Sequence, residues 1–138
     1  MSFSNYTNQA ILNSLFGKTS NFGALGSAPT MYVALFTTKP GEDGTGATEV
    51  SGGSYAREAT AATDWNTASN ADPSELTNAN DIDFGTTTAS WGTVVAAGLY
   101  DASTGGNFLG AFDLTTSKTI GNGDAVSFPA GEFKLRAD

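Results

Sequence analysis

The chain has 138 residues and an acidic composition, with 6 Lys and Arg against 14 Asp and Glu and a formal net charge of −8. This size suits one domain with one hydrophobic core. The basic residues are scattered, which argues against binding to nucleic acid or to an anionic membrane surface, because both require clustered positive charge. The sequence has no Cys and no His. It therefore excludes thiol and imidazole catalysis, disulfides and the usual zinc sites, and we expect no metal ion and no cofactor.

The N-terminal sequence MSFSNYTNQA lacks the basic region and the apolar run of a secretory signal peptide. No run in the chain approaches the ~20 apolar residues that a membrane-spanning helix needs. We therefore expect a protein that is made in the cytoplasm and is used or assembled there.

Residues 1–18 are predicted to form an N-terminal helical segment, with the helix itself over residues 4–16. Ser4 suits the start of a helix, and Gly17 suits the left-handed position just after its end. We favour a helix that covers an open end or edge of a sheet, and the alternative is a helix that docks on a partner molecule. Its apolar side chains form one stripe at helical spacing. The stripe consists of Ile11, Leu12, Leu15 and Phe16.

Two segments are apolar at successive positions, as expected of strands that are covered on both faces. The first is residues 31–37, with the sequence MYVALFT. The second is a hairpin over residues 91–112, in which WGTVVAAGLY and NFLGAF flank the turn residues DASTGG. Both segments are predicted to be interior strands of a packed all-β body.

Residues 39–54 are predicted to form a long loop, because they are polar and rich in Gly. The loop carries Glu42, Asp43 and Glu49, whose oxygens are of the kind that bind Ca²⁺. Their spacing matches no EF-hand pattern, and acidic surface loops are common. We therefore favour an ordinary loop over a metal site.

The middle and the second half of the chain have weaker patterns. Residues 55–65 are predicted to form a strand, at an edge of the sheet, and residues 66–80 a connection. Residues 114–118 are predicted to turn the chain, and residues 119–120 to start another strand.

Three further segments alternate apolar and polar residues, as in strands with one buried face. The predicted fold is therefore all-β, a single β-sandwich or jelly roll over residues 1–138 with a short N-terminal α-helix. An open barrel is the alternative. The apolar positions of the alternating segments are Ile82, Phe84, Val126, Phe128, Phe133 and Leu135.

Catalytic chemistry has few candidates in this sequence. Asp81 and Asp83 share a strand face, which we expect to be solvated, so they are unlike the cleft carboxylates of a glycosidase. Ser and Thr have no His to activate them, and no GxSxG motif is present. Trp65, Trp91 and Tyr100 are candidates for stacking on a sugar, although Trp in a small β-protein is more often core. We predict no catalytic residues and a non-enzymatic protein.

The N-terminal region is the predicted interface. It offers more apolar surface than a short helix needs to cover an end of the sheet, and the loop that follows adds two isolated hydrophobic residues. A cluster of exposed hydrophobic residues indicates a contact with another molecule. The candidate interface residues are Phe3, Tyr6, Ile11, Leu15, Phe22 and Leu25.

Three blocks of sequence together resemble a group of small virion proteins of tailed bacteriophages. They are SFSNYTNQAILNSLFGKTS, MYVALFTTKPGEDGTGATEVSGGSYAR and SWGTVVAAGLYDASTGGNFLGAFDLTTSKTIGNGDAVSFPAGEFKL. Such proteins are often labelled tail-fibre proteins, and similar small all-β proteins serve as capsid cement or decoration proteins. The resemblance implies a virion protein that is made in the host cytoplasm, and it implies no catalytic residues.

The resemblance leaves the place in the virion open, and we choose on physical grounds. A fibre shaft needs repeats or long coiled segments, and the sequence has none. We therefore favour a capsid cement protein, with the major capsid protein and other copies of itself as partners in a symmetric cluster. The alternative is a tail-fibre or baseplate component that binds a carbohydrate or another receptor.

Overall fold

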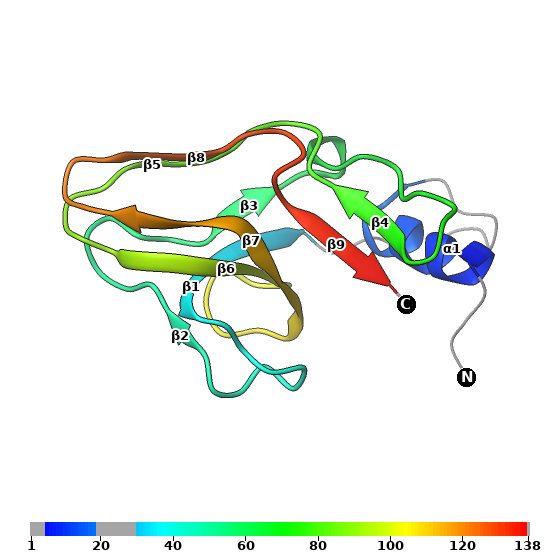
Figure 1. Cartoon of the computed structure of the whole chain (residues 1–138), viewed down its shortest axis with the longest axis horizontal. Helices are drawn as coiled ribbons and strands as arrows, with labels where there is room; N and C mark the ends of the chain where they lie inside the picture. The colour runs from blue at the N-terminus through cyan, green and yellow to red at the C-terminus, as the bar shows by residue number, and fades with distance from the viewer. Residues whose placement is uncertain (1–4, 19–29, 138) are drawn as a thin grey trace.

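The computed structural model describes residues 5–18 and 30–137, with the side chains of residues 5–7 left out. Within these ranges the chain forms one α-helix, one 3-10 helix and nine strands (Figure 1). The elements are α1 (Asn5–Leu15), β1 (Met31–Thr38), β2 (Thr48–Glu49), β3 (Glu58–Thr60), η1 (Ala62–Asp64), β4 (Ser74–Thr77), β5 (Ile82–Thr86), β6 (Gly92–Tyr100), β7 (Phe108–Ile120), β8 (Ala125–Phe128) and β9 (Lys134–Ala137).

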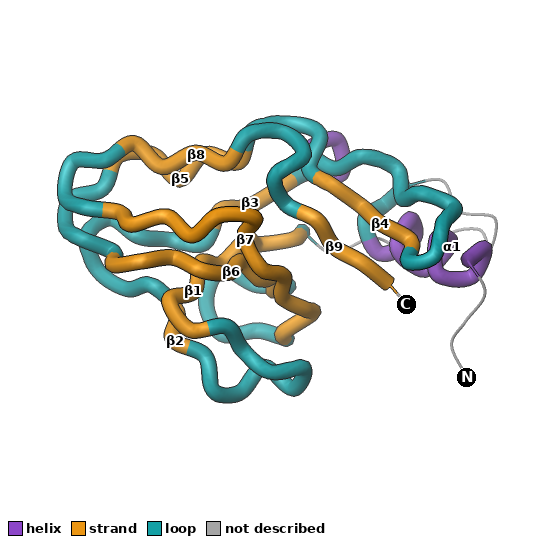
Figure 2. Tube along the Cα trace, in the orientation of Figure 1, coloured by secondary structure: helices purple, strands orange, loops and turns teal. Residues whose placement is uncertain are grey.

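Five strands form the main sheet, in the order β2-β1-β6-β7 with β3 also paired to β1, and every pairing is antiparallel. The pairs β5-β8 and β4-β9 form two antiparallel ribbons outside this sheet (Figure 2). One large core joins side chains of the main sheet with those of both ribbons and of α1. The sandwich-like all-β fold with a short N-terminal helix is therefore confirmed.

The strands β1 and β6 are the interior strands of the main sheet, as predicted. They pair with each other over Tyr32↔Tyr100 to Phe36↔Ala96, and each has a further neighbour on its other side. Met31, Val33 and Leu35 of β1 point into the large core. Ala34 and Phe36 point the other way, into a smaller cluster with Ala96. The successive apolar residues thus cover both faces of one strand.

The hairpin of β6 and β7 is confirmed, but β7 is longer than predicted. Residues 114–118 do not turn the chain, and residues 119–120 end a strand instead of starting one. The register passes from Ala96↔Asp113 to Val94↔Lys118, so β7 carries extra residues that β6 lacks. This β-bulge lets exposed Thr and Ser side chains remain within a continuous strand. Their polarity made the segment resemble a turn.

Residues 55–65 form a short strand and a helical turn in place of the single strand that was predicted. The ladder between β1 and β3 ends at Met31↔Thr60, where β1 itself begins. The chain then turns into η1, where Asp64 Oδ2 accepts a hydrogen bond of 2.8 Å from the Ala61 N–H. This local hydrogen bond competes with strand formation.

Strands β2 and β4 lie in the predicted loop and the predicted connection, so neither strand was predicted. Strand β2 has two residues, and Leu76 is the single large apolar residue of β4. Short strands of this kind carry no periodic pattern, and their pairing partners fix them. The predicted strands around residues 82–84, 126–128 and 133–135 are present as β5, β8 and β9.

Helix α1 packs against β4 and β9 at one end of the molecule (Figure 1). It ends at Leu15, one residue before the predicted end, and Gly17 adopts the predicted left-handed position after the helix with a φ of 68°. The Lys18 N–H bonds the carbonyl of Asn13 at 2.7 Å, and this satisfies a carbonyl at the helix end. The predicted first residue, Ser4, lies outside the described residues. No helix in the described ranges is long and apolar enough to cross a membrane.

Candidate functional site

The predicted interface residues lie on and around α1, and the structure describes two of their side chains. Ile11 is 36% exposed, and Leu15 is half-buried and packs against the large core. The side chain of Tyr6 is not described, and Phe3, Phe22 and Leu25 lie outside the described residues. The interface at this end of the molecule therefore stays a prediction, with Ile11 as its described exposed member.

Two polar side chains fix the orientation of α1. Gln9 Nε2 donates a hydrogen bond of 2.9 Å to the carbonyl of Ala68, and Asn13 Oδ1 accepts one of 2.8 Å from the N–H of the same residue. Asn13 is itself buried. We call these two hydrogen bonds the Ala68 clamp. The clamp was not predicted from the sequence, because Ala68 lies 59 residues from Gln9 in the chain. The clamp turns Leu12 and Phe16 into the core and leaves Ile11 outside.

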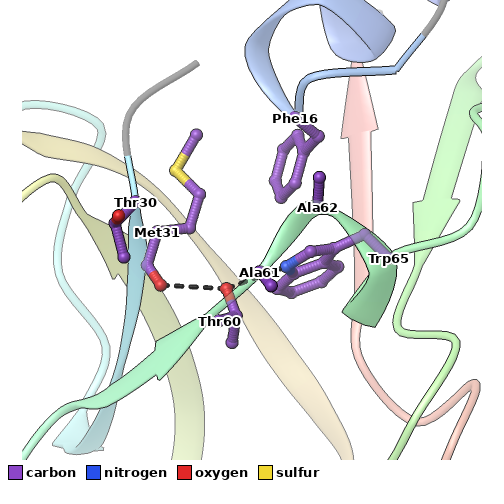
Figure 3. A pocket seen from close by; sticks show the side chains of 7 residues that line it. All are labelled: Phe16, Thr30, Met31, Thr60, Ala61, Ala62 and Trp65. Atoms are coloured by element: carbon purple, nitrogen blue, oxygen red, sulfur yellow. Dashed lines mark hydrogen bonds between the residues drawn. The ribbon is translucent and has the colours of Figure 1, made fainter. Parts of the chain in front are cut away.

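A small hollow of about 130 Å³ lies between α1, the start of β1 and η1 (Figure 3). Its most polar groups are already bonded: Trp65 Nε1 donates to Thr60 Oγ1, and Thr60 Oγ1 donates to the carbonyl of Met31, both at 2.9 Å. The Phe16 ring stands edge-on to Trp65 at 4.9 Å. A hollow of this size and lining has few free polar groups to orient a ligand. It is lined by Phe16, Thr30, Met31, Thr60, Ala61, Ala62 and Trp65.

The three aromatic candidates for sugar stacking have other contacts. Trp65 and Trp91 are 2% and 4% exposed and belong to the core, which was the prediction favoured over sugar stacking. Trp91 Nε1 donates to the carbonyl of Gly53 at 3.0 Å. Tyr100 is half-buried, and the guanidinium of Arg57 lies 3.6 Å from the centre of its ring. None of these three rings presents an open face for a sugar.

Asp81 and Asp83, the candidate carboxylate pair, each accept a hydrogen bond from a backbone N–H. Asp81 and Asp83 are exposed, as predicted. Asp81 Oδ1 accepts a hydrogen bond from the Ala130 N–H at 3.1 Å, and Asp83 Oδ1 accepts one from the Gly85 N–H at 2.7 Å. Asp81 thus supports the turn that follows β8, and Asp83 supports the irregularity within β5.

The acidic residues of the 39–54 loop do not converge on one point. Asp43 accepts hydrogen bonds from the Thr45 N–H and hydroxyl at 3.0 and 2.8 Å, and these bonds hold the pKa of Asp43 below its ordinary value. Glu49 instead binds Arg57. Among the described residues, no three Asp or Glu side chains gather in a group that could hold a metal ion.

Arg57 is the centre of a polar network that joins separate parts of the chain. It binds both oxygens of Glu49 at 2.9 Å. Its Nη1 donates to the carbonyls of Ala102 and Gly105 at 3.1 and 2.8 Å. One side chain thus ties β2 to the loop between β6 and β7. The partners of Arg57 are 8 to 48 residues away in the sequence, so no local sequence pattern predicted the network.

The network extends through Tyr55 to the interior of the main sheet. The Tyr55 hydroxyl donates to Glu49 Oε1 at 2.8 Å and accepts from the Leu35 N–H at 3.0 Å. Burial raises the pKa of Tyr55 far above its usual range. Burial also acts to raise the pKa of Glu49, but the hydrogen bonds from Arg57 and Tyr55 outweigh it and hold that pKa below its ordinary value. The side chains of Arg57, Glu49 and Tyr55 all have hydrogen-bond partners, so the network stabilises the fold and offers no free acid or base.

Comparison with known proteins gives one match that spans almost the whole chain. The model of a family described as "Podophage GP4 fiber I protein gp80" matches residues 2–136. No curated protein matches the chain. The fibre description agrees with the tail-fibre alternative better than with the capsid-cement role favoured from the sequence. The chain therefore belongs to the family of the podophage GP4 fiber I protein gp80, and it is a structural protein of the phage virion.

Proposed function

We propose that the protein is a non-enzymatic fibre component of the tail of a phage, where it acts by binding to its neighbours in the virion or to a host receptor. The observation that carries this proposal is the family match, because it spans residues 2–136 and so includes every described element except the end of β9. The polar clusters of the described residues support a structural role, since their acids and bases are occupied in holding loops together.

A fibre component works through a rigid body and repeated contacts. The two-faced packing of β1 and the clamp on α1 provide the rigid body. Repeated contacts between copies let modest individual interfaces add up to a stable assembly. We place these contacts at the α1 end, where Ile11 is exposed.

Capsid cement is the second candidate, and the compact shape of the described domain favours it. The described residues form a two-layered body without any repeated unit that would build a shaft. In that role the α1 end would contact the major capsid protein as well as other copies of the chain.

Labelling of intact virions separates the two functions. Antibody fragments against the recombinant protein, viewed by cryo-electron microscopy, should lie around the tail in a small symmetric set of positions. Label spread over the faces of the head would overturn the tail assignment in favour of cement. As a control, the same fragments should leave unlabelled a phage from which the gene for this protein has been deleted.

A separate assay addresses the absence of enzymatic activity. The purified protein, incubated with polysaccharide from the host surface, should release no new reducing ends, because Asp81, Asp83 and Glu49 are committed to backbone hydrogen bonds and an ion pair. Release of reducing ends that stops when Asp81 or Asp83 is replaced by Asn would refute the non-enzymatic assignment.

A further inference from the structure

A groove runs along the free edge of β7, the last strand of the main sheet. Strand β7 pairs with β6 on one side, and within the described residues no strand pairs with its other side. Strand β9 lies alongside, but it pairs with β4 alone (Figure 1). Two adjoining hollows of about 470 and 380 Å³ follow this edge and share Lys39, Ala111, Leu135 and Arg136. We call them together the β7 groove.

The backbone of the β7 groove can accept another strand. An edge strand presents the N–H and C=O groups of alternate residues away from its sheet, and an added strand can bond to them. Residues 110–113 of β7 pair in regular register with Ala96–Leu99 of β6, between an irregularity at Leu109 and the larger bulge that follows Asp113. This stretch is long enough to pair with a short extended segment of another chain, and the bulge marks where the pairing would stop.

The side chains of the β7 groove select for the partner's chemistry. Leu109 is 37% exposed and is one of two large hydrophobic side chains that are exposed among the described residues. Lys39, Lys134 and Arg136 line the walls, and they are three of the six basic residues in a chain of net charge −8. Within the described residues Lys134 makes no ion pair.

Carboxylates nearby neutralise this charge only in part. Lys39 bonds Asp113 at 2.9 Å, but both side chains are largely exposed, so the pair contributes little and can exchange partners. Arg136 bonds Glu75 at 2.9 Å through its Nε and is 59% exposed. Glu42 also lines the groove, so its lining carries three basic side chains and two acidic ones, Glu42 and Asp113. The groove is therefore net positive on an otherwise acidic molecule, and its charge favours an acidic segment.

We propose that the β7 groove binds an extended segment of another virion protein, with alternating acidic and apolar residues, which adds to β7 as a further strand. The apolar side chains of this segment pack on Leu109 and Ala111, and its carboxylates pair with Lys134 and the other basic residues. The proposal holds for a fibre and for a cement protein alike, so it does not depend on the place of the protein in the virion.

The test uses the full-length protein and three synthetic peptides with blocked ends. The first is Glu-Val-Glu-Val-Glu-Val-Glu, the second has Lys in place of every Glu, and the third has Pro in place of the central Val. Binding is followed by nuclear magnetic resonance, with amide hydrogen exchange as a second measurement. The acidic peptide should shift the amide signals of residues 108–113 and slow the exchange of alternate amides there. The Lys and Pro peptides should do neither.

Two matched charge reversals show whether the groove is responsible. Lys134→Glu should weaken the affinity for the acidic peptide about fivefold, the effect of losing one partly exposed ion pair. Lys18→Glu makes the same change beside α1, away from the groove, and should leave the affinity unchanged. Thermal unfolding of both variants checks that they are folded.

Four results would overturn the proposal. One is that the acidic peptide does not bind at a concentration of about 1 mM, which is well above the dissociation constant of a useful contact. Another is equal binding of the Lys peptide. A third is binding without any slowed exchange in β7, because that indicates charge attraction without strand addition. The last is self-association of the protein that Lys134→Glu abolishes, because the occupant is then a second copy of this chain.

Discussion

Arg57 stabilises the molecule because its four hydrogen bonds reach acceptors in separate parts of the chain. Its side chain is 9% exposed, and that of its partner Glu49 is 26% exposed. A charge at this depth is stable only while its hydrogen-bond partners remain, so removal of one partner leaves the other desolvated and unpaired. The stacking of the guanidinium on Tyr100 adds a cation–π contact.

Replacement of Arg57 should therefore cost much more stability than replacement of an exposed Arg. We expect Arg57→Ala to lower the free energy of unfolding by about 2–3 kcal/mol, measured by urea denaturation. The matched control is Arg136→Ala, which removes an ion pair with an exposed Arg and should cost less than about 1 kcal/mol. Equal losses in the two variants would contradict the central position of Arg57.

Two glutamates should contribute to the pH dependence of stability with opposite signs. The pKa of Glu49 is lowered in the folded state, so its contribution is present above its ordinary pKa and is lost as the pH falls through the folded value. The pKa of Glu58 is raised, by burial and then by the charges of Asp83 and Asp64. Its charged form therefore destabilises the fold, and protonation on acidification removes the penalty.

The expected result is a pair of variants that move in opposite directions. At about pH 7 Glu49→Gln should lower the urea midpoint and Glu58→Gln should raise it. On acidification the difference for Glu58→Gln should disappear first, because the pKa of Glu58 is raised, and the difference for Glu49→Gln should shrink only as the pH falls through the lowered pKa of Glu49. If the difference for Glu58→Gln instead grows towards acid pH, the charged form of Glu58 does not destabilise the fold.

At the scale of elements, helix α1 is positioned by polar contacts as much as by its apolar stripe. Leu12 and Phe16 supply buried area, but the bonds of Gln9 and Asn13 to Ala68 fix which residues face outward. An apolar stripe alone permits a range of rotations about the helix axis. The exposure of Ile11 is thus a consequence of the clamp.

Asn13→Ala should destabilise the protein by about 1–3 kcal/mol, because it leaves the N–H of Ala68 buried without its acceptor. Hydrogen exchange at the Ala68 amide should rise in this variant. Ile11→Ser, on the same helix, should change the free energy of unfolding by less than about 0.5 kcal/mol, since the side chain is exposed. A larger loss for Ile11→Ser would mean that Ile11 is core.

The elements that the sequence predicted well are those whose pattern is complete within themselves. β1 and β6 are apolar on both faces, and β5 and β8 alternate, so local residues suffice to identify them. The elements that it missed depend on distant partners: β4 exists because β9 pairs with it some 60 residues later, from Ser74↔Ala137 to Thr77↔Lys134. The bulge of β7 is likewise defined only against β6.

The candidate site was predicted less completely than the fold, for the same physical reason. The hydrophobic residues of the N-terminal sequence predicted an interface at the α1 end, and Ile11 is exposed there. The Ala68 clamp, the Arg57 network and the β7 groove join residues that are far apart in the chain, and none has a local pattern. Chain topology brings them together, so they became visible only in three dimensions.

At the scale of the whole molecule, the net charge opposes the assembly contact that we predict at the α1 end. The charge of −8 makes free copies repel, and salt screens this repulsion. An apolar contact at the α1 end is little affected by screening. Association of copies should therefore become stronger as the ionic strength rises.

This assembly can be tested with Phe3 and Tyr6, two predicted interface residues. We expect the full-length protein to form a symmetric oligomer, and Phe3→Ser combined with Tyr6→Ser to weaken it without changing thermal unfolding. Light scattering after size-exclusion chromatography measures the oligomer, and Ile11→Ser should weaken it too. If the double variant unfolds, these residues belong to the core and the predicted interface is wrong.

The pairing of β1 with β6 has a consequence for how the chain is synthesised. Strand β1 is apolar on both faces, yet its partner follows more than 55 residues later, as the pairing Phe36↔Ala96 shows. At about 5–20 residues per second, a ribosome exposes β1 for several seconds before β6 appears. During this interval the nascent chain depends on chaperones or slow elongation to avoid aggregation. Lower growth temperature during recombinant expression should accordingly raise the soluble yield.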